Sequence, residues 1–541
     1  MRVPGQIPPI VSGGHGAASA CASLVMAGQT SARFRPTDKH GGRSVVAALL
    51  PLIPPAIRTA CFPRAVSAQS ACAAWASDQR RNAEPRGSNP AIDVQTSGML
   101  MGGEETMSLT KYLMAAFLTT TMLASPALAQ DEAKTVIIHA GTLLANPGEA
   151  PLTERSIILN GNRIEAIEAG FVQRDGAEIV DLRNAFVMPG MIDSHVHITS
   201  QLAPDARLKT VENSDADWAI QGAKHGKRTL EAGFTTVQDL GARGQDAVFA
   251  LRDASKKNDL PLPRIRAAGY SLSVSGGHGD GRQGYNDDVA EVLHKDSICN
   301  GADDCRRAAR EQIRKGADII KITATGGVLS NTLAGFNQQF TNPEIEAIVD
   351  AANSMGRKVT AHAHGLDGIN SSLTSGVMSI EHGTYLDDSS IALFKEKGAY
   401  LVPTVMAGDY VAKTAKDAAW MTEAQRIKSL EAGPLMLDML RKAHAGGVKI
   451  AFGTDSGVSI HGDNATELVL MVEAGMTPQQ ALTAATVNAA EHIGMADQVG
   501  TLEVGKLADI IAVDGNPLEN IERMRNVGFV MKDGIVYKSA L

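Results

Sequence analysis

The sequence predicts an α/β fold, a (β/α)8 barrel of the TIM type with a small β-sandwich domain built from both ends of the mature chain. Three observations predict it. Apolar, strand-like runs alternate with helical stretches through the middle of the chain, which is typical of parallel strands joined by crossover helices. Short strands separated by turns occupy both flanks. Histidine, lysine and acidic side chains lie in or directly after the apolar runs, so a barrel would gather them at one mouth.

The chain of 541 residues is long enough for a barrel and a satellite domain. We expect five segments along it. They are an upstream segment without a stable fold at 1–106, a signal peptide at 107–129, the first part of the sandwich at 130–188, the barrel at 189–504 and the second part of the sandwich at 505–541.

The upstream segment is rich in Ala, Gly, Pro, Ser and Arg and shows no sustained hydrophobic period. A signal-like pattern begins at Met107, with Lys111, an apolar stretch at 113–123 and small residues up to Ala129. We therefore expect translation to start at Met107, cleavage near Ala129 and a secreted or periplasmic protein. The rival interpretation is a membrane anchor, but the stretch is too short and too rich in Thr, so we expect no stable membrane span in the mature chain.

Two cysteines, Cys299 and Cys305, remain after the signal. In an exported protein such a close pair predicts a disulfide that closes a loop. The alternative is a metal site, which would need further ligands that the neighbouring sequence does not offer.

The elements follow from the same patterns. The flanking strands are predicted at 136–138, 156–159, 163–167, 178–181, 508–513, 528–531 and 535–537. The barrel strands are predicted at 186–197, 235–240, 265–272, 319–325, 358–364, 378–382, 400–405 and 449–454. Helices are predicted at 305–315, 342–355 and 422–445, and another after Thr477-Pro478, where an N-cap precedes a proline.

Composition excludes one large class of function. The formal net charge is -8 and the pI is near 6, so the chain has no general basic character of the kind that nucleic-acid binding needs. We expect no nucleic-acid partner, and a small-molecule or peptide substrate instead.

Two His-x-His pairs point to metal chemistry. His195 and His197 end the first barrel strand, and the period of two in a strand points both rings to one face. His362 and His364 form the second pair, and His382 and Asp455 also end barrel strands. Neutral imidazole is the commonest protein ligand for zinc, and a carboxylate beside it can also move a proton. Asp455 could instead cap the next helix.

Lys321 stands in an apolar strand, where its charge would be costly unless the amine were modified or deprotonated. Carbon dioxide would convert it to a carbamate, whose two oxygens could bridge two metals about 3.5 to 4 Å apart. The alternative is a salt-bridged lysine of the barrel.

These motifs resemble the amidohydrolase superfamily. The resemblance rests on MPGMIDSHVH at 188–197, GADIIKI at 316–322, AHAHG at 361–365, IEHGT at 380–384 and GTD at 453–455. Within the superfamily they are similar to the imidazolonepropionase-related branch, and most similar to its Xaa-Pro dipeptidases, carboxypeptidase-like enzymes and ochratoxin-hydrolysing members.

The resemblance implies two divalent metal ions, and zinc is the expected metal. His195, His197 and Asp455 would hold one ion and His362 and His382 the other, with Lys321 as the bridging carbamate formed from carbon dioxide. It also implies hydrolysis of the amide bond in an aminoacyl or N-acyl amino acid, including ochratoxin A, by a homo-oligomer that could be an octamer.

Three side chains receive catalytic or substrate-binding roles in this interpretation. Asp455 would carry the proton to the leaving amine, and His364 would bind the substrate carbonyl. His278, in a Gly-rich loop, would meet a substrate carboxylate, or is an ordinary loop histidine. Asp239 is expected to orient a neighbour. Two other functions stay open: a cyclic amidase or imidazolonepropionase-like ring hydrolase, and a non-catalytic oligomeric scaffold.

Overall fold

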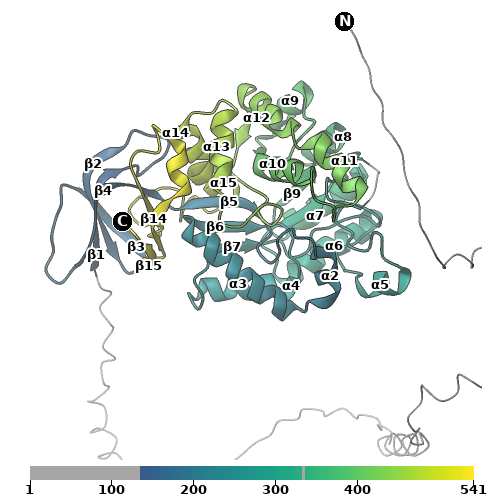
Figure 1. Cartoon of the computed structure of the whole chain (residues 1–541), viewed down its shortest axis with the longest axis horizontal. Coiled ribbons are helices and arrows are strands. Elements are labelled where there is room, and N and C mark those ends of the chain that lie inside the picture. Colours follow the sequence, from purple (N-terminus) through teal and green to yellow (C-terminus); the bar gives the residue numbers. More distant parts are fainter. Residues whose placement is uncertain (1–134, 332–334) are drawn as a thin grey trace, which may run out of the picture. The chain divides into compact units, whose positions relative to one another are not determined.

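The computed structural model describes residues 135–331 and 335–541. The upstream segment and the signal peptide predicted for 1–129 lie outside the described residues. Within them no helix is both long and apolar enough to cross a membrane. Figure 1 shows the arrangement of the labelled elements.

Eight parallel strands of the described chain form the barrel. They are β5 (Met191–Val196), β6 (Phe234–Asp239), β7 (Arg264–Ala267), β8 (Ile320–Thr323), β9 (Val359–Ala363), β10 (Ser379–His382), β11 (Tyr400–Val402) and β12 (Lys449–Ile450). Ladders pair β5 to β7 and β8 to β12 in chain order. Leu272, beyond β7, bonds to both Lys321 and Thr323, which joins the two sheets.

The barrel closes where the chain beyond β12 meets β5. Ser194 N–H donates to the Phe452 carbonyl over 2.9 Å, and Asp455 N–H donates to the His195 carbonyl over 2.8 Å. The predicted barrel is therefore confirmed, and its side chains pack as a continuous apolar core.

Helices connect the strands and lie around them (Figure 1). They are α2 (Ala206–Glu212), α3 (Asp215–Glu231), α4 (Gln245–Lys256), α5 (Asp287–Val292), α6 (Ala302–Lys315), α7 (Asn342–Ser354), α8 (Leu366–Thr374), α9 (Asp388–Lys397), α10 (Val405–Thr414), α11 (Glu423–Ala432), α12 (Leu435–Ala445), α13 (Thr466–Glu473), α14 (Pro478–Thr483) and α15 (Ala489–His492). A π-helical turn, η2 (Ala484–Asn488), joins α14 to α15, and a 3₁₀ turn, η3 (Ile521–Arg525), precedes β14.

Both flanks of the chain contribute to a second sheet, as predicted. Its seven strands follow the order β15-β14-β13-β4-β1-β2-β3. Their bounds are β1 (Thr135–Leu143), β2 (Leu152–Asn160), β3 (Arg163–Ala169), β4 (Glu178–Pro189), β13 (Ile510–Asp514), β14 (Val527–Lys532) and β15 (Ile535–Ser539). The antiparallel pairing of β13 with β4 joins the two flanks, and their apolar side chains form a core cluster of their own.

Several predicted strands are shorter in the structure, among them those at 265–272, 400–405 and 449–454, and two predicted elements are each divided in two. The expected single strand at 186–197 is split at Gly190, whose N–H donates to the Asp509 carbonyl, so β4 belongs to the second sheet and β5 to the barrel. A Cβ at Gly190 would lie 2.2 Å from Thr235 Oγ1, so only glycine fits this crossing. The expected helix at 422–445 is two helices, because Pro434 interrupts the run between α11 and α12.

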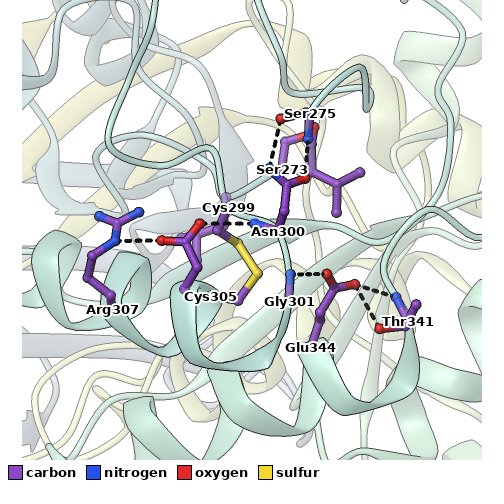
Figure 2. The surroundings of a disulfide bond; sticks show 12 residues. Ser273, Ser275, Cys299, Asn300, Gly301, Cys305, Arg307, Thr341 and Glu344 are labelled. Carbon is purple, nitrogen blue, oxygen red and sulfur yellow. Dashed lines mark hydrogen bonds and ion pairs between the residues drawn. A yellow bond between two sulfur atoms is a disulfide. The ribbon is translucent and has the colours of Figure 1, made fainter.

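Cys299 and Cys305 form a disulfide that connects a loop to the first turn of α6 (Figure 2). Beside it, Gly301 N–H donates to Glu344 Oε1 over 2.6 Å, which ties this loop to α7. Cys299 N–H donates to the Ser273 carbonyl. The disulfide thus anchors a loop that approaches the carboxyl end of β7.

Candidate active site

Three side chains from the closing seam of the barrel form one group of possible metal ligands. His195 lies in β5, His197 directly follows it, and Asp455 follows β12. Asp455 Oδ1 lies 3.0 Å from His197 Nε2 and 3.5 Å from His195 Nε2. Their ligand atoms lie within 4.8 Å of one another, so two imidazoles and a carboxylate can bind one divalent ion here.

Hydrogen bonds on the far side of each ring decide which nitrogens face the group. His195 Nδ1 donates to Glu381 Oε2 over 2.8 Å, and His197 Nδ1 donates to the Gly241 carbonyl over 2.7 Å. In a neutral imidazole the remaining Nε2 is then an acceptor. Both Nε2 lone pairs therefore face the Asp455 carboxyl group, and a cation between them would stabilise this arrangement.

The pKa shifts in this group have two opposing causes. Burial holds the pKa of His195 well below its ordinary value, which keeps the ring neutral. Burial also acts to lower the pKa of His197, but the adjacent Asp455 carboxylate outweighs it and raises that pKa. Without a metal ion, Asp455 favours a proton at the position where an ion would bind.

Three histidines form a second group of possible ligands. His362 lies in β9, His364 follows that strand, and His382 ends β10. Their ligand atoms lie within 4.8 Å of one another. Threonine hydroxyls contact two of the rings, Thr384 at His364 Nδ1 and Thr404 at His382 Nδ1, each over 2.7 Å.

Burial lowers the pKa of all three histidines, that of His364 to about 3, so the rings are neutral near pH 7. His362 Nε2 is buried and has no hydrogen-bond partner. Buried polar atoms are rarely left without a partner, and an unpaired imidazole nitrogen beside two other rings fits a metal ligand. The grouping also puts His364, predicted to bind the carbonyl, at a possible ligand position.

Lys321 extends from β8 into the same site. Its side chain is buried, and its Nζ lies 3.4 Å from His195 Nε2. Among the described residues it forms no ion pair, so the salt-bridged alternative is not what the structure contains. Burial lowers the pKa of its amine. The Glu381, Asp455 and Asp239 carboxylates oppose this shift from beyond ion-pair distance, so the lysine lies near acids but has no direct ion pair.

All these side chains line one cavity of about 340 Å³. His278, on the loop after β7, also lines it and stacks on His362 with ring centroids 4.3 Å apart. Burial lowers the pKa of His278 to about 3. Asp239 lies behind the site, where it accepts from the N–H groups of Ile198 and Gly241. The carbonyl of Gly241 in turn accepts the hydrogen bond from His197. Asp239 therefore orients His197 through the backbone at Gly241, in line with the expectation that it orients a neighbour.

Sequence reasoning missed two buried acids that position the ligands. Glu381, in β10, accepts from His195 with one oxygen and from the hydroxyls of Thr360 and Ser379 with the other. Asp193, in β5, accepts from the Thr454 hydroxyl and from other donors around the seam. A charged residue inside an apolar strand was the signal available for both, the same signal that singled out Lys321.

Comparisons with known proteins identify the family of this chain. The model of the amidohydrolase family matches residues 186–536. The ochratoxinase of Aspergillus niger is 32% identical over 435 residues, which cover 75% of this chain and 88% of that protein. A solved Xaa-Pro dipeptidase with methionine bound in its active site is 40% identical, with a TM-score of 0.72, over 75% of this chain and 100% of that one.

A solved prolidase in complex with N-methylphosphonate-L-proline is 30% identical, with a TM-score of 0.69, and the match again covers 75% of this chain and 100% of that one. The family match spans more than half of this chain and includes every residue of the two ligand groups. The chain therefore belongs to the amidohydrolase family and is a metal-dependent hydrolase that acts on amide bonds.

Proposed function

We propose that this chain uses two divalent metal ions to cleave the amide bond of aminoacyl or N-acyl amino acids with a free carboxylate. Zinc is the expected metal. The observation that carries the proposal is the meeting of two separate ligand groups and an unpaired, buried lysine in one cavity. The similarity to a Xaa-Pro dipeptidase, a prolidase and an ochratoxinase supports a substrate of this class.

Lys321 would join the two groups as a carbamate. Its neutral amine attacks carbon dioxide, a C–N bond forms, and the nitrogen releases a proton to the solvent. The product carries one negative charge and two oxygen ligands, where the ammonium had only donors. Burial disfavours the charged ammonium and so raises the share of neutral amine that can attack, while the bound cations would offset the charge of the carbamate.

When bound, two divalent ions here would lower the pKa of a water between them and polarise the scissile carbonyl. Asp455 accepts the proton of the attacking water and carries it to the leaving amine, since its carboxyl group faces the cavity beside both rings of the first group.

The role of His364 depends on Thr384. If the Thr384 hydroxyl donates to Nδ1, the Nε2–H of His364 is free to donate to the substrate oxygen as negative charge develops there. If Nδ1 donates instead, Nε2 becomes a metal ligand. We assign the first arrangement to the substrate-bound enzyme.

Candidate substrates include dipeptides that end in proline, phenylalanine or another apolar residue, and the phenylalanine amide of ochratoxin A, which would yield phenylalanine and ochratoxin alpha. We further propose that the mature enzyme is secreted or periplasmic and assembles as a homo-oligomer, with an octamer as one form.

The test compares wild-type enzyme with Lys321→Ala and with Lys209→Ala as a matched control. Lys209 lines the same cavity but is paired with Asp205 over 3.0 Å, so its loss should leave the metals in place. We expect Lys321→Ala to lose metal by elemental analysis. Its dipeptide hydrolysis should fall by at least the roughly 10- to 100-fold that is typical when an outer partner of a metal ligand is removed. After growth with ¹³C-bicarbonate, only proteins with Lys321 should show a carbamate signal by NMR.

Retention of both metal and activity in Lys321→Ala would show that the bridge is wrong. Parallel assays with hydantoins and imidazolones separate the proposed reaction from ring hydrolysis, because a ring hydrolase would prefer substrates without a carboxylate tail.

A further inference from the structure

A second, outer cavity of about 610 Å³ adjoins the active-site cavity. Four residues line both: Trp218, Arg243, Tyr270 and Lys295. They come from α3, from the loops that follow β6 and β7, and from the loop before α6. Apolar side chains of Val211, Val292 and Leu293 contribute to the outer wall. The four shared residues therefore stand where a substrate would pass from one cavity to the other.

The two shared cations differ from Lys209 and Lys315, which also line these cavities. Lys209 is paired with Asp205 over 3.0 Å, and Lys315 is paired with Asp296 over 3.1 Å. Arg243 and Lys295 form no ion pair within the described part of the chain. The carboxylates of Asp215, Asp288 and Asp296 also line the outer cavity, but none of them forms an ion pair with Arg243 or Lys295, so an anionic ligand could pair with these two cations.

Lys295 is held in a defined place. Its Nζ lies 3.8 Å from the centre of the Tyr270 ring, a cation–π contact. Its loop is anchored four residues later by the Cys299–Cys305 disulfide. Burial and the nearby Arg243 lower the pKa of Lys295 to about 8, against a smaller opposing effect of Asp215. The two cations are thus close enough to repel each other.

His278 is a poor alternative for binding an anion. The Ser330 hydroxyl donates to the Gly327 carbonyl over 3.0 Å, so its oxygen accepts from His278 Nδ1 over 2.7 Å. This leaves His278 Nε2 as an acceptor on a neutral ring. It can receive an N–H group of a substrate, but it offers no proton to a carboxylate.

We infer that Arg243 and Lys295 bind the α-carboxylate of the substrate's leaving residue, and that the outer cavity, with Trp218 and Tyr270 at its entrance, receives the apolar side chain of that residue. The inference rests on the proposed function and extends it by assigning the part of the site that selects free carboxylates. An apolar side chain in the outer cavity would cover apolar surface such as that of Val292, which is 83% exposed to water.

The test uses two substrates that differ only in the carboxylate, N-acetyl-L-phenylalanine and N-acetyl-2-phenylethylamine. We expect the wild-type kcat/KM to favour the acid, and the double variant Arg243→Gln, Lys295→Met to lose about tenfold to a hundredfold of that preference, the range for a hydrogen bond to a charged group. The control variant Lys209→Met should keep it. An unchanged preference in the double variant would overturn the inference.

A binding measurement makes the test independent of turnover. Calorimetry on zinc-loaded enzyme compares L-phenylalanine with L-phenylalaninamide. We expect the double variant to bind L-phenylalanine at least tenfold more weakly than the wild type, with little change for the amide. If the wild type binds L-phenylalanine more tightly than the double variant does but hydrolyses neither substrate, the carboxylate subsite is supported and the proposed reaction is wrong. Equal binding by wild type and double variant would refute the subsite.

Discussion

Replacement of Glu381 by glutamine tests whether the barrel positions His195 for metal binding. Glu381 is fully buried and accepts three hydrogen bonds, from His195 on one oxygen and from the hydroxyls of Thr360 and Ser379 on the other. The amide of Glu381→Gln keeps the shape of the side chain but has only one oxygen. The amide oxygen can accept either from His195 or from the two hydroxyls, but not from both.

Both placements of the amide weaken the site. If its oxygen faces His195, the ring keeps the Nδ1 proton but loses the negative charge behind it, which makes Nε2 a weaker ligand. If its nitrogen faces His195, the ring must carry its proton on Nε2, and the lone pair that faces Asp455 disappears. We expect metal affinity to fall about 10- to 100-fold, the range for outer partners of metal ligands, which is about 1.4 to 2.8 kcal/mol.

The assay is metal content of Glu381→Gln over a series of buffered free zinc concentrations, with hydrolytic activity at each concentration. Glu311→Gln serves as control, because Glu311 is paired with Arg314 on the outer surface of α6. A zinc affinity equal to that of the wild type would refute the reasoning that the Glu381–His195 hydrogen bond prepares the ligand. Low activity that saturating zinc does not restore would instead indicate a change in the reaction.

Two further predictions concern stability. Burial raises the pKa of Glu467 to about 8 from its ordinary value of 4.5, so the folded protein keeps a proton that the unfolded chain has released. The free energy of unfolding of the wild type should therefore fall by a few kcal/mol between about pH 5 and pH 8, whereas that of Glu467→Gln should not. Melting temperatures of the two proteins that change in parallel over this pH range would contradict the prediction. Arg264 connects the barrel to the second sheet through buried Asp509, so Arg264→Met should cost about 3 kcal/mol in denaturant unfolding, unlike exposed Arg314→Met.

The sequence predicts the barrel well because its strands are buried on both faces, so each reads as a nearly continuous apolar run. The same property hides the boundary at Gly190, since the apolar run continues across it. That boundary depends on a bond to Asp509, more than 300 residues away in the sequence. Pairing partners at such a distance leave no local pattern, and therefore the split between the two sheets is visible only in the folded chain.

The site divides in the same way. His195 lies near the end of β5, and His197 and Asp455 lie beyond the ends of β5 and β12; the closed barrel must bring strand ends together, so their meeting was predictable. The roles of Arg243 and Lys295 were not predictable, because their positions depend on irregular loops and on a disulfide. Whether a cation has a counter-ion is a property of loop packing, and the sequence alone does not reveal it.

Three residues of the site have left-handed backbone that non-glycine residues rarely adopt. They are His382 with φ 74°, Thr404 with φ 49° and Asp455 with φ 55°, and each lies at or just beyond the end of a barrel strand. Such a conformation costs about 1 to 3 kcal/mol at each residue. A strand that continued in extended form would carry these side chains past the cavity, so the turn is what brings His382 and Asp455 to their groups.

Buried acids behind the cavity hold this strained backbone. Glu467 accepts from the N–H groups of Val405 and Met406, which directly follow Thr404. Asp193 accepts from the N–H and the hydroxyl of Thr454, which directly precedes Asp455. Neither acid lines the cavity. Burying these acids costs free energy. In return, their hydrogen bonds hold two segments beyond barrel strands in a left-handed conformation that the chain would otherwise not keep.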